Sequence, residues 1–583
     1  MSDKKKIKSI LCIVLTIALF STVLYVLYLA YTKSTATSSN ATASKNASYV
    51  DSVFNKDKVM EINIEMDKDD LQDMFDNALD TKYKSADITI NGTKYENVAI
   101  KPKGNTTLTQ IANDDTTDRY SFKLKFDKYV DDQTLDGLSK LVLNNCMSDT
   151  TYMKEYLSYD LLSTLGVNTP AYSYAHITIN GEEWGLYLAV EPIEEEFIER
   201  YYGDASGNLY KPESDDISMP KQNNVNNDNN NNNGNMTPPT NEVNGENGAN
   251  NNMPTPPNMP NGNMPTPPNM QNGENGEMPS PPDMNFEDMP SPPNGGMGGD
   301  MNRDTNGADL VWNGDDIEEY SAIFDNAEFK HTTEEDYEKI LDMIEHLDSL
   351  DNIEKYLDVD GVLKYFAANT FLVNLDSYAS FMKHNYYLYE TNGVVSILPW
   401  DYNLSFGGFQ GGSASNVINF PIDSPVSGSL ESSPLIGKLL EVDEYKEKYH
   451  NYLKEIVDNY INNGTYENTI NKLNTLISPY VEKDATAFYT FEEYTNSIPH
   501  LIAFGKDRAT SISAQLSGAQ PSTTAGNIET TVDLNAMGQH GGEPKNGDKK
   551  GMMPPNMNGN FTPPENNNTS DSNTTDNNND DNN

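Results

Sequence analysis

Hydrophobic and polar residues alternate with a period of two along several short stretches of the first half of the chain. Residues 86–104 (ADITINGTKYENVAIKPKG) and 175–191 (AHITINGEEWGLYLAVE) each alternate on both sides of an Asn-Gly pair. Such a pair between two alternating runs is typical of a β-hairpin with a two-residue turn. The pattern therefore predicts two hairpins in this half of the chain.

Two further stretches predict one strand and one helix. In residues 119–126 (RYSFKLKF) apolar side chains share one face, and Arg119, Ser121, Lys123 and Lys125 share the other. In residues 149–166 (DTTYMKEYLSYDLLSTLG) apolar residues recur at helical spacing between an aspartate that can cap a helix and a glycine that can end one. We therefore expect residues 53–212 to form a β-rich N-terminal part with at least one helix.

The regular pattern of hydrophobic and polar residues ends near residue 212 and resumes near residue 308. Residues 213–307 consist of asparagine runs and Met-Pro-(Thr/Ser)-Pro-Pro repeats, and residues 518–583 have a similar Pro/Asn/Gly/Asp-rich composition. Such segments cannot bury enough apolar surface to offset the loss of chain entropy on folding. The sequence therefore predicts a disordered insert and a disordered tail, which flank a mainly helical C-terminal part at 308–517.

The N-terminus indicates a membrane anchor. A basic segment, residues 1–9, precedes the apolar residues 10–32, which contain no charged side chain and are long enough to cross a bilayer as a helix. The lysines before this helix favour a cytoplasmic N-terminus, and no small-residue cleavage site clearly follows it. We predict a single-pass cell-membrane protein with residues 33–52 as a linker and the bulk of the chain extracytoplasmic.

Composition excludes some functions. The formal net charge of -48 argues against a nucleic-acid partner, since phosphate backbones require lysine and arginine fields. The cysteines are Cys12, inside the apolar run, and Cys146, so a disulfide is not expected. The seven histidines are scattered and none makes a zinc-type spacing with a cysteine.

A third predicted hairpin carries the main candidate site. In residues 385–408 (NYYLYETNGVVSILPWDYNLSFGG), an Asn-Gly turn places Asn385 across from Trp400 and next to Asp401, and Asp376 lies upstream. An Asp, an Asn, a hairpin and a second Asp is the order of the catalytic and Mg²⁺-binding residues of protein kinases. The alternative is that these residues only cap a helix or loop, begin a strand and cap a turn.

The N-terminal part offers possible complements to this site. Lys123 and Lys125 project from one strand and Glu155 lies on the predicted helix after it, as the phosphate-gripping lysine and its glutamate do in kinases. Residues 101–107 (KPKGNTT) can form a turn over phosphates or an ordinary hairpin end. The usual kinase motifs His-Arg-Asp, Asp-Phe-Gly and G-x-G-x-x-G are absent.

Several segments together resemble the spore coat protein H (CotH) kinase family, in the order in which they occur there. They are KPKGNTT, SFKLKF, the block from LVLNNCMSDTTYMKEYL to GLYLAVEPIEEEFIER, GNLYKP and HNYYLYETNGVVSILPWDYNLSFGG. The resemblance covers about residues 53–212 and 308–515, and the block ending in GLYLAVE and the PWD motif are specific to the family. The insert is not part of the family core.

The resemblance implies an α+β, atypical protein-kinase-like two-lobe fold with a β-rich N-lobe and a helical C-lobe. It also implies binding of ATP with Mg²⁺ and phosphorylation of Ser/Thr in a protein substrate, which includes this protein's own chain as a candidate. Asp376 is then the catalytic acid, and Asn385 and Asp401 bind the metal. The implied phosphate-binding residues are Lys103, Lys123, Lys125 and Glu155.

One departure from the family pattern leaves a second interpretation open. The family usually has another Asp two residues after that of PWD, where this chain has Asn403. An amide can still coordinate a metal, but it carries no charge. The alternative is a non-catalytic cell-surface or spore-surface adhesion or scaffold protein with a degenerate kinase fold, since ATP is scarce outside a cell.

Overall fold

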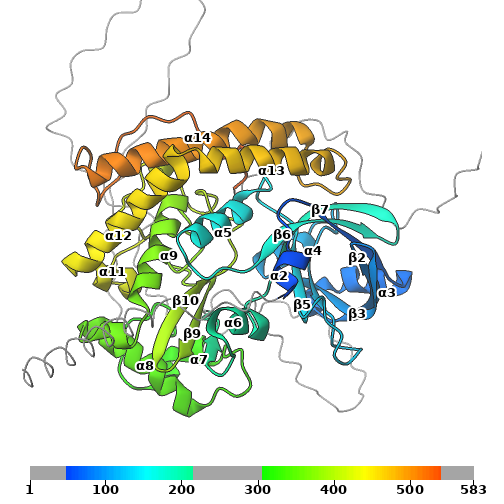
Figure 1. Ribbon diagram of the computed structural model, residues 1–583, viewed down its shortest axis with the longest axis horizontal. Helices are drawn as coiled ribbons and strands as arrows, with labels where there is room; N and C mark the ends of the chain where they lie inside the picture. The colour runs from blue at the N-terminus through cyan, green and yellow to red at the C-terminus, as the bar shows by residue number, and fades with distance from the viewer. Residues whose placement is uncertain (1–47, 214–304, 540–583) are drawn as a thin grey trace, which may run out of the picture. The chain divides into compact units, whose positions relative to one another are not determined.

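The computed structural model describes residues 48–213 and 305–539, which all belong to one compact unit (Figure 1). The predicted basic segment 1–9 and membrane helix 10–32 lie outside the described residues, as do the predicted insert between 214 and 304 and the tail beyond 539. Residues 48–52, predicted to end a linker, belong to the helix α2 (Ser48–Val53). Its Tyr49 is buried and donates a hydrogen bond to Glu191 at 2.5 Å.

The alternating stretches of the first half form a closed barrel. Its strand order is β1-β2-β3-β4-β5-β7-β6, with every neighbouring pair antiparallel except β1 and β6, which are parallel. Both predicted Asn-Gly hairpins are confirmed, between β2 and β3 and between β6 and β7. The strands are β1 (Met60–Glu65), β2 (Lys84–Ile90), β3 (Thr93–Lys103), β4 (Ser121–Lys125), β5 (Lys140–Asn144), β6 (Tyr172–Ile179) and β7 (Glu182–Val190).

Alternate residues of these strands fill the barrel. Phe122, Leu124 and Phe126 are fully buried in a core that includes the apolar positions of β1, β2, β3 and β6. Three α-helices connect barrel strands: α3 (Lys68–Asp76) between β1 and β2, α4 (Thr106–Ala112) between β3 and β4, and α5 (Lys154–Thr164) between β5 and β6. The predicted apolar face of residues 119–126 is therefore confirmed as a core face.

The remainder is a three-stranded sheet surrounded by helices. The sheet has the order β10-β9-β8, with β8 (Asn208–Tyr210), β9 (Tyr386–Thr391) and β10 (Val394–Pro399). Helices α13 and α14 lie side by side (Figure 1). The helices are α5 (Lys154–Thr164), α6 (Glu195–Tyr202), α7 (Ser321–Phe324), α8 (Glu334–Ser349), α9 (Val359–Leu372), α10 (Ala414–Ile418), α11 (Pro434–Leu440), α12 (Asp443–Ile456), α13 (Thr465–Val481) and α14 (Phe491–Leu516).

The helix predicted at 149–166 begins five residues later, at Lys154. The reason lies in Asp149, whose carboxylate accepts hydrogen bonds from the backbone N–H groups of Thr151 at 2.9 Å and Lys154 at 2.8 Å. This local bonding holds residues 149–153 in a turn that precedes the helix. As predicted, Asp149 caps this segment, but it lies five residues before the first residue of the helix.

The predicted two-lobe kinase-like fold is wrong for the described residues. The β-rich part is a closed barrel, and closure depends on the parallel pairing of β1 with β6, which no local pattern reports. The two halves of the sequence also do not form separate lobes, because β8 pairs with β9 and α5 packs on α9. One hydrophobic core joins β6, β7 and α5 to the C-terminal helices.

The described residues give no support to the predicted single-pass membrane localisation, whose helix at residues 10–32 lies outside them. In the part of the chain that the structure describes, no helix combines the length and the apolar character that crossing a membrane requires.

The described structure continues past residue 518, where the tail was predicted to begin. Residues 519–539 follow α14 and include the buried side chains of Val532, Leu534 and Met537. Val532 and Leu534 alternate with polar residues, but this run is too short to predict a strand from the sequence.

Candidate functional site

The hairpin β9–β10 has the register that its Asn-Gly turn predicts. Thr391 lies opposite Val394 at one end of the ladder and Tyr386 lies opposite Pro399 at the other. Asn385, directly before the ladder, and Asp401, two residues after it, have positive φ angles of 58° and 59°. Residues other than glycine adopt this left-handed conformation at a cost, which Asn and Asp bear most easily, and such positions cluster at functional sites.

Asp376 is the centre of a small hydrogen-bonded network. Its Oδ1 lies 2.7 Å from Nε2 of His384, and its Oδ2 accepts a hydrogen bond from Nδ2 of Asn385 at 3.1 Å. Nδ2 of Asn385 also donates to the backbone carbonyl of Asp376 at 3.0 Å. Because Asp376 itself is buried, these two neighbours fix the direction of its carboxylate.

A second network joins the barrel to α5. Lys103, the last residue of β3, donates from Nζ to Oδ1 of Asn144 at 3.0 Å. Nδ2 of Asn144, at the end of β5, donates to both carboxylate oxygens of Glu155, at 3.0 and 2.9 Å. Asn144 thus links Lys103 to Glu155 through hydrogen bonds at both ends of its amide group.

Electrostatic coupling joins the two networks. Burial and the nearby carboxylate of Asp401 together raise the pKa of Glu155 to about 7, although Asn144 and Lys103 oppose the rise. Loss of water also raises the pKa of Asp401, with Lys103 opposing and Asp376 adding to the effect. We use the name polar cluster for Lys103, Asn144, Glu155, Asp376, His384, Asn385 and Asp401.

Among the predicted site residues, the structure brings some together and leaves others apart. Lys103, Glu155, Asp376, Asn385 and Asp401 all belong to the polar cluster. Lys123 and Lys125 are engaged elsewhere, Lys123 with Glu194 at 2.7 Å and Lys125 with Asp127 at 3.7 Å. Lys140 also pairs with Glu194, so that this carboxylate is shared by two lysines. Of the three candidate lysines, Lys103 is therefore the one beside Glu155 and Asp401.

Two residues of the polar cluster, Asn144 and His384, were not predicted from the sequence. Asn144 ends an apolar strand, and His384 directly precedes Asn385, but neither position has a pattern that distinguishes it from an ordinary loop residue. Asn403, which stands where the family has a second Asp, donates from Nδ2 to the carbonyl of Met147 at 3.3 Å. Its amide nitrogen is thus used to hold the loop that follows β5.

The polar cluster fits a nucleotide with a hard divalent cation. Among the hydrogen bonds of the described residues, none is donated to the carboxylate of Asp401, and only its backbone N–H is engaged, by Tyr159 at 3.2 Å. The amide oxygen of Asn385 likewise accepts no bond within residues 48–213 and 305–539. These free oxygens are the ligand type that Mg²⁺ prefers, and Lys103 is a cation close to Asp401.

The described residues contain no group of three or more His, Cys, Asp or Glu side chains arranged to hold a metal on their own. Mg²⁺ does not require such a cage, because it is commonly bound through one or two carboxylates together with water and the phosphates of a substrate. The polar cluster therefore suits a Mg²⁺ ion that binds together with a nucleotide.

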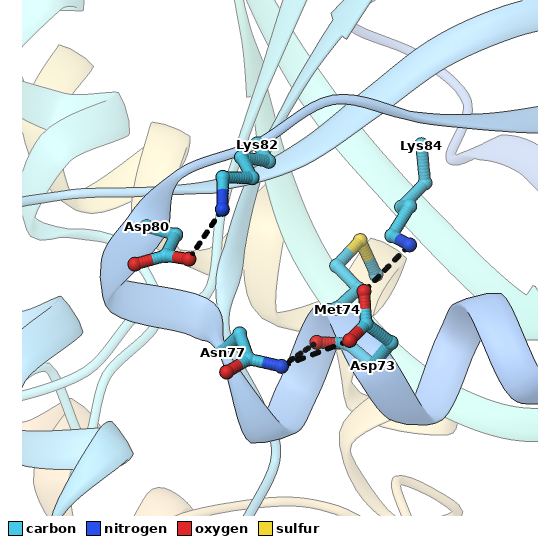
Figure 2. A pocket seen from close by; sticks show the side chains of 6 residues that line it. All are labelled: Asp73, Met74, Asn77, Asp80, Lys82 and Lys84. Atoms are coloured by element: carbon cyan, nitrogen blue, oxygen red, sulfur yellow. Dashed lines mark hydrogen bonds and ion pairs between the residues drawn. The ribbon is translucent and has the colours of Figure 1, made fainter. Parts of the chain in front are cut away.

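A hollow elsewhere on the protein has a different character. It lies beside α3 and is lined by Asp73, Met74, Asn77, Asp80, Lys82 and Lys84 (Figure 2). Its charged residues already pair with one another, Lys82 with Asp80 at 2.7 Å and Lys84 with Asp73 at 2.6 Å. It contains none of the residues of the polar cluster, and we treat it as a paired surface feature.

Comparison with known proteins gives the family. The sequence model of the family described as CotH kinase protein matches residues 100–250 and 290–512, together more than half of the chain. The inner spore coat protein H of Bacillus subtilis (strain 168) is 20% identical over 393 residues, which cover 66% of this chain and 80% of that protein. The family match includes every residue of the polar cluster, and the chain belongs to the CotH kinase family.

Proposed function

We propose that this protein is a Mg²⁺-dependent kinase that transfers the γ-phosphate of ATP to Ser/Thr hydroxyls of a protein substrate. The observation that carries the proposal is the polar cluster, in which a lysine held by Asn144 and Glu155 lies beside Asp401 and the Asp376–Asn385 pair. Membership of the CotH kinase family supports the same reaction class.

Each residue of the polar cluster has a role in this reaction. Lys103 binds phosphate oxygens, and Asn144 with Glu155 keeps its ammonium group in place. Asp401 and Asn385 hold the metal, and a bound Mg²⁺ neutralises charge on the phosphates. Asp376 accepts the proton of the acceptor hydroxyl as the hydroxyl oxygen bonds to the γ-phosphorus and the bond to the ADP oxygen breaks.

His384 is a positioning residue for Asp376. Its Nε2 lies 2.7 Å from Oδ1 of Asp376, while Asn385 engages Oδ2. With one neighbour on each oxygen, the carboxylate cannot rotate without breaking a hydrogen bond. His384 thus helps to present a fixed oxygen to the incoming hydroxyl.

The relative's name supports a place of action. It is named an inner spore coat protein, and we propose that the present protein acts on proteins of a spore coat.

Replacement of the proposed base tests the function. Asp376→Asn keeps the shape of the side chain but cannot accept the hydroxyl proton, so we expect transfer to fall by at least about 100-fold. Binding of Mg-ATP should be retained, since Asp376 serves the acceptor. The measurement is transfer of labelled γ-phosphate from ATP to a protein substrate by the full chain, with nucleotide affinity measured by calorimetry.

The same measurements separate the kinase from a scaffold. If the wild-type chain neither binds Mg-ATP nor transfers phosphate, the proposal is wrong and the non-catalytic scaffold is favoured. If Asp376→Asn transfers phosphate at the wild-type rate, the protein is a kinase but the role given to Asp376 is wrong.

We also propose that the protein phosphorylates its own insert at Thr255, Thr266, Ser280 and Ser291. The insert begins within a few residues of Lys211, which lies close enough to influence the pKa values of Asp401 and Lys103. A tethered acceptor has a high effective concentration.

Mass spectrometry after incubation with Mg-ATP tests this self-modification. We expect phosphate on the four repeats in the wild type and none in Asp376→Asn treated in the same way. Phosphate confined to residues outside the insert would contradict the proposal while leaving the kinase activity itself in place.

A further inference from the structure

Residues 519–539 turn back along α14, where Thr530 donates to Asp507 at 2.7 Å and the backbone N–H of Asp533 donates to His500 at 3.1 Å. We call this segment the C-terminal strap. Ser522 bonds to Asp423 twice, through its backbone carbonyl at 2.8 Å and through its hydroxyl at 2.7 Å. Further along, the backbone N–H and carbonyl of Ile528 bond to the side chain of Asn419 at 2.8 and 2.9 Å. These bonds hold the strap against the end of α10 and the loop that follows it.

The end of the strap is seated beside α5. The backbone carbonyl of Met537 accepts a hydrogen bond from the N–H of Thr150 at 3.1 Å, and the Met537 side chain is only 1% exposed. Gln539 donates from Nε2 to the carbonyl of Gly407 at 3.4 Å. The strap therefore touches two segments at once: the turn that leads into α5 and the loop that follows Asp401.

Lys154 is the strongest link between the strap and the polar cluster. Its side chain is fully buried, and its ammonium group donates to the backbone carbonyls of Ser148, at 3.2 Å, and of Gly538. Burial lowers its pKa to about 8 while Asp149 opposes the change. A buried ammonium group is costly unless its donors are satisfied, so Gly538 supplies a partner that the helix itself does not. Lys154 directly precedes Glu155.

We propose that the C-terminal strap is a positioning element of the polar cluster. It holds the start of α5, and with it Glu155, against the loop that carries Asp401. This inference rests on the proposed function for its effect on nucleotide binding. Its structural part, the immobilisation of the two segments, does not depend on the reaction.

Two glycines of the same region offer a matched pair of variants. Gly538 has a φ of 85°, and a Cβ atom there would lie 2.7 Å from the Ser148 carbonyl oxygen and 2.9 Å from the Thr150 nitrogen. Gly518 has a φ of 72°, and a Cβ atom there would meet nothing within 4 Å. Gly538→Val therefore lifts the strap end from its seat, whereas Gly518→Val imposes similar backbone strain without this clash.

The test compares Mg-ATP affinity and amide hydrogen exchange in the full-length variants. Because small displacements of positioning groups have large effects, we expect Gly538→Val to weaken Mg-ATP binding by about tenfold to 100-fold. Amides of residues 150–160 and 402–408 should also exchange faster than in the wild type. Gly518→Val should match the wild type in both measurements, even if its melting temperature falls by as much as that of Gly538→Val.

Equal behaviour of the two glycine variants in hydrogen exchange would overturn the positioning role. If exchange responds as expected but the wild type does not bind Mg-ATP, the strap inference survives in its structural part and the proposed function fails. Should Gly538→Val not fold, Gln539→Ala removes only the bond to Gly407, and faster exchange restricted to residues 402–408 is the expected result. Unchanged exchange in that variant would likewise contradict the proposal.

Discussion

Asp401→Asn should abolish phosphoryl transfer while leaving the protein folded. The substitution removes one negative charge from the place where the metal and phosphates meet, and the loss of such electrostatic stabilisation costs about 100-fold to 1,000-fold in rate. Asn is preferred to Ala in this experiment because the φ of Asp401 is 59°, a conformation that Asn adopts readily and Ala does not. The measurement is transfer of labelled γ-phosphate together with Mg-ATP affinity.

The metal role of Asp401 gives a specific pattern across the two measurements. We expect Mg²⁺-dependent nucleotide binding to weaken in Asp401→Asn, in contrast to Asp376→Asn, in which only transfer is lost. Asp80→Asn provides the control, since Asp80 is paired with Lys82 in the hollow beside α3 and lies outside the polar cluster. Transfer at the wild-type rate by Asp401→Asn would remove this residue from the proposed mechanism.

The hairpin that carries Asn385 and Asp401 could be predicted in detail because its determinants are local. The Asn-Gly turn at Asn392 and Gly393 sets the register of every pair from Thr391 and Val394 onward. The same holds for the two hairpins of the barrel. Where a turn and the strands that flank it are contiguous in sequence, the pattern of residues is sufficient to predict how the strands pair.

The closure of the barrel and the choice of lysine could not be predicted because both depend on distant segments. β1 pairs with β6 across more than 100 residues of sequence, and neither strand carries a mark of its partner. Lys103 and Lys123 look alike in the sequence, and both lie on barrel strands. Only the fold shows that Glu194 takes Lys123 and that Asn144 brings Lys103 to Glu155.

Arg119 illustrates the same limit for a structural residue. The alternating pattern places it on the polar face of a strand, yet its side chain is fully buried. Its guanidinium group donates to Asp484 at 2.7 Å, and to the carbonyls of Leu186 at 2.5 Å and Asn145 at 3.2 Å. Burial is the largest single effect and opposes the charge, but Asp484 together with Tyr187 and Tyr152 raises the pKa of Arg119 overall. The partner lies 365 residues further along the chain, beyond any local signal.

Asp484→Ala should therefore cause the largest loss of stability among the substitutions considered. Asp484 accepts the bond from Arg119 through Oδ1 and a bond from the N–H of Leu186 through Oδ2 at 2.9 Å, and both partners of the ion pair are fully buried. Removal of one partner leaves a buried, uncompensated charge, which costs about 3–5 kcal/mol of the free energy of unfolding. The absence of a side chain at Gly185 matters here, because a Cβ atom would lie 2.1 Å from the Asp484 carboxylate.

Urea unfolding of the full-length variants measures this cost. Asp57→Asn is the control, since Asp57 forms an exposed ion pair with Lys472, and exposed pairs contribute little to stability. If the cost arises from the unpaired guanidinium group, the double variant Arg119→Met/Asp484→Leu should be more stable than Asp484→Ala, because replacement of both charges leaves no buried ion. The single variants Arg119→Met and Asp484→Leu complete the comparison. If the loss of stability in the double variant equals the sum of their two losses, Arg119 and Asp484 stabilise the protein independently, and the ion pair between barrel and helices is not the source of the effect.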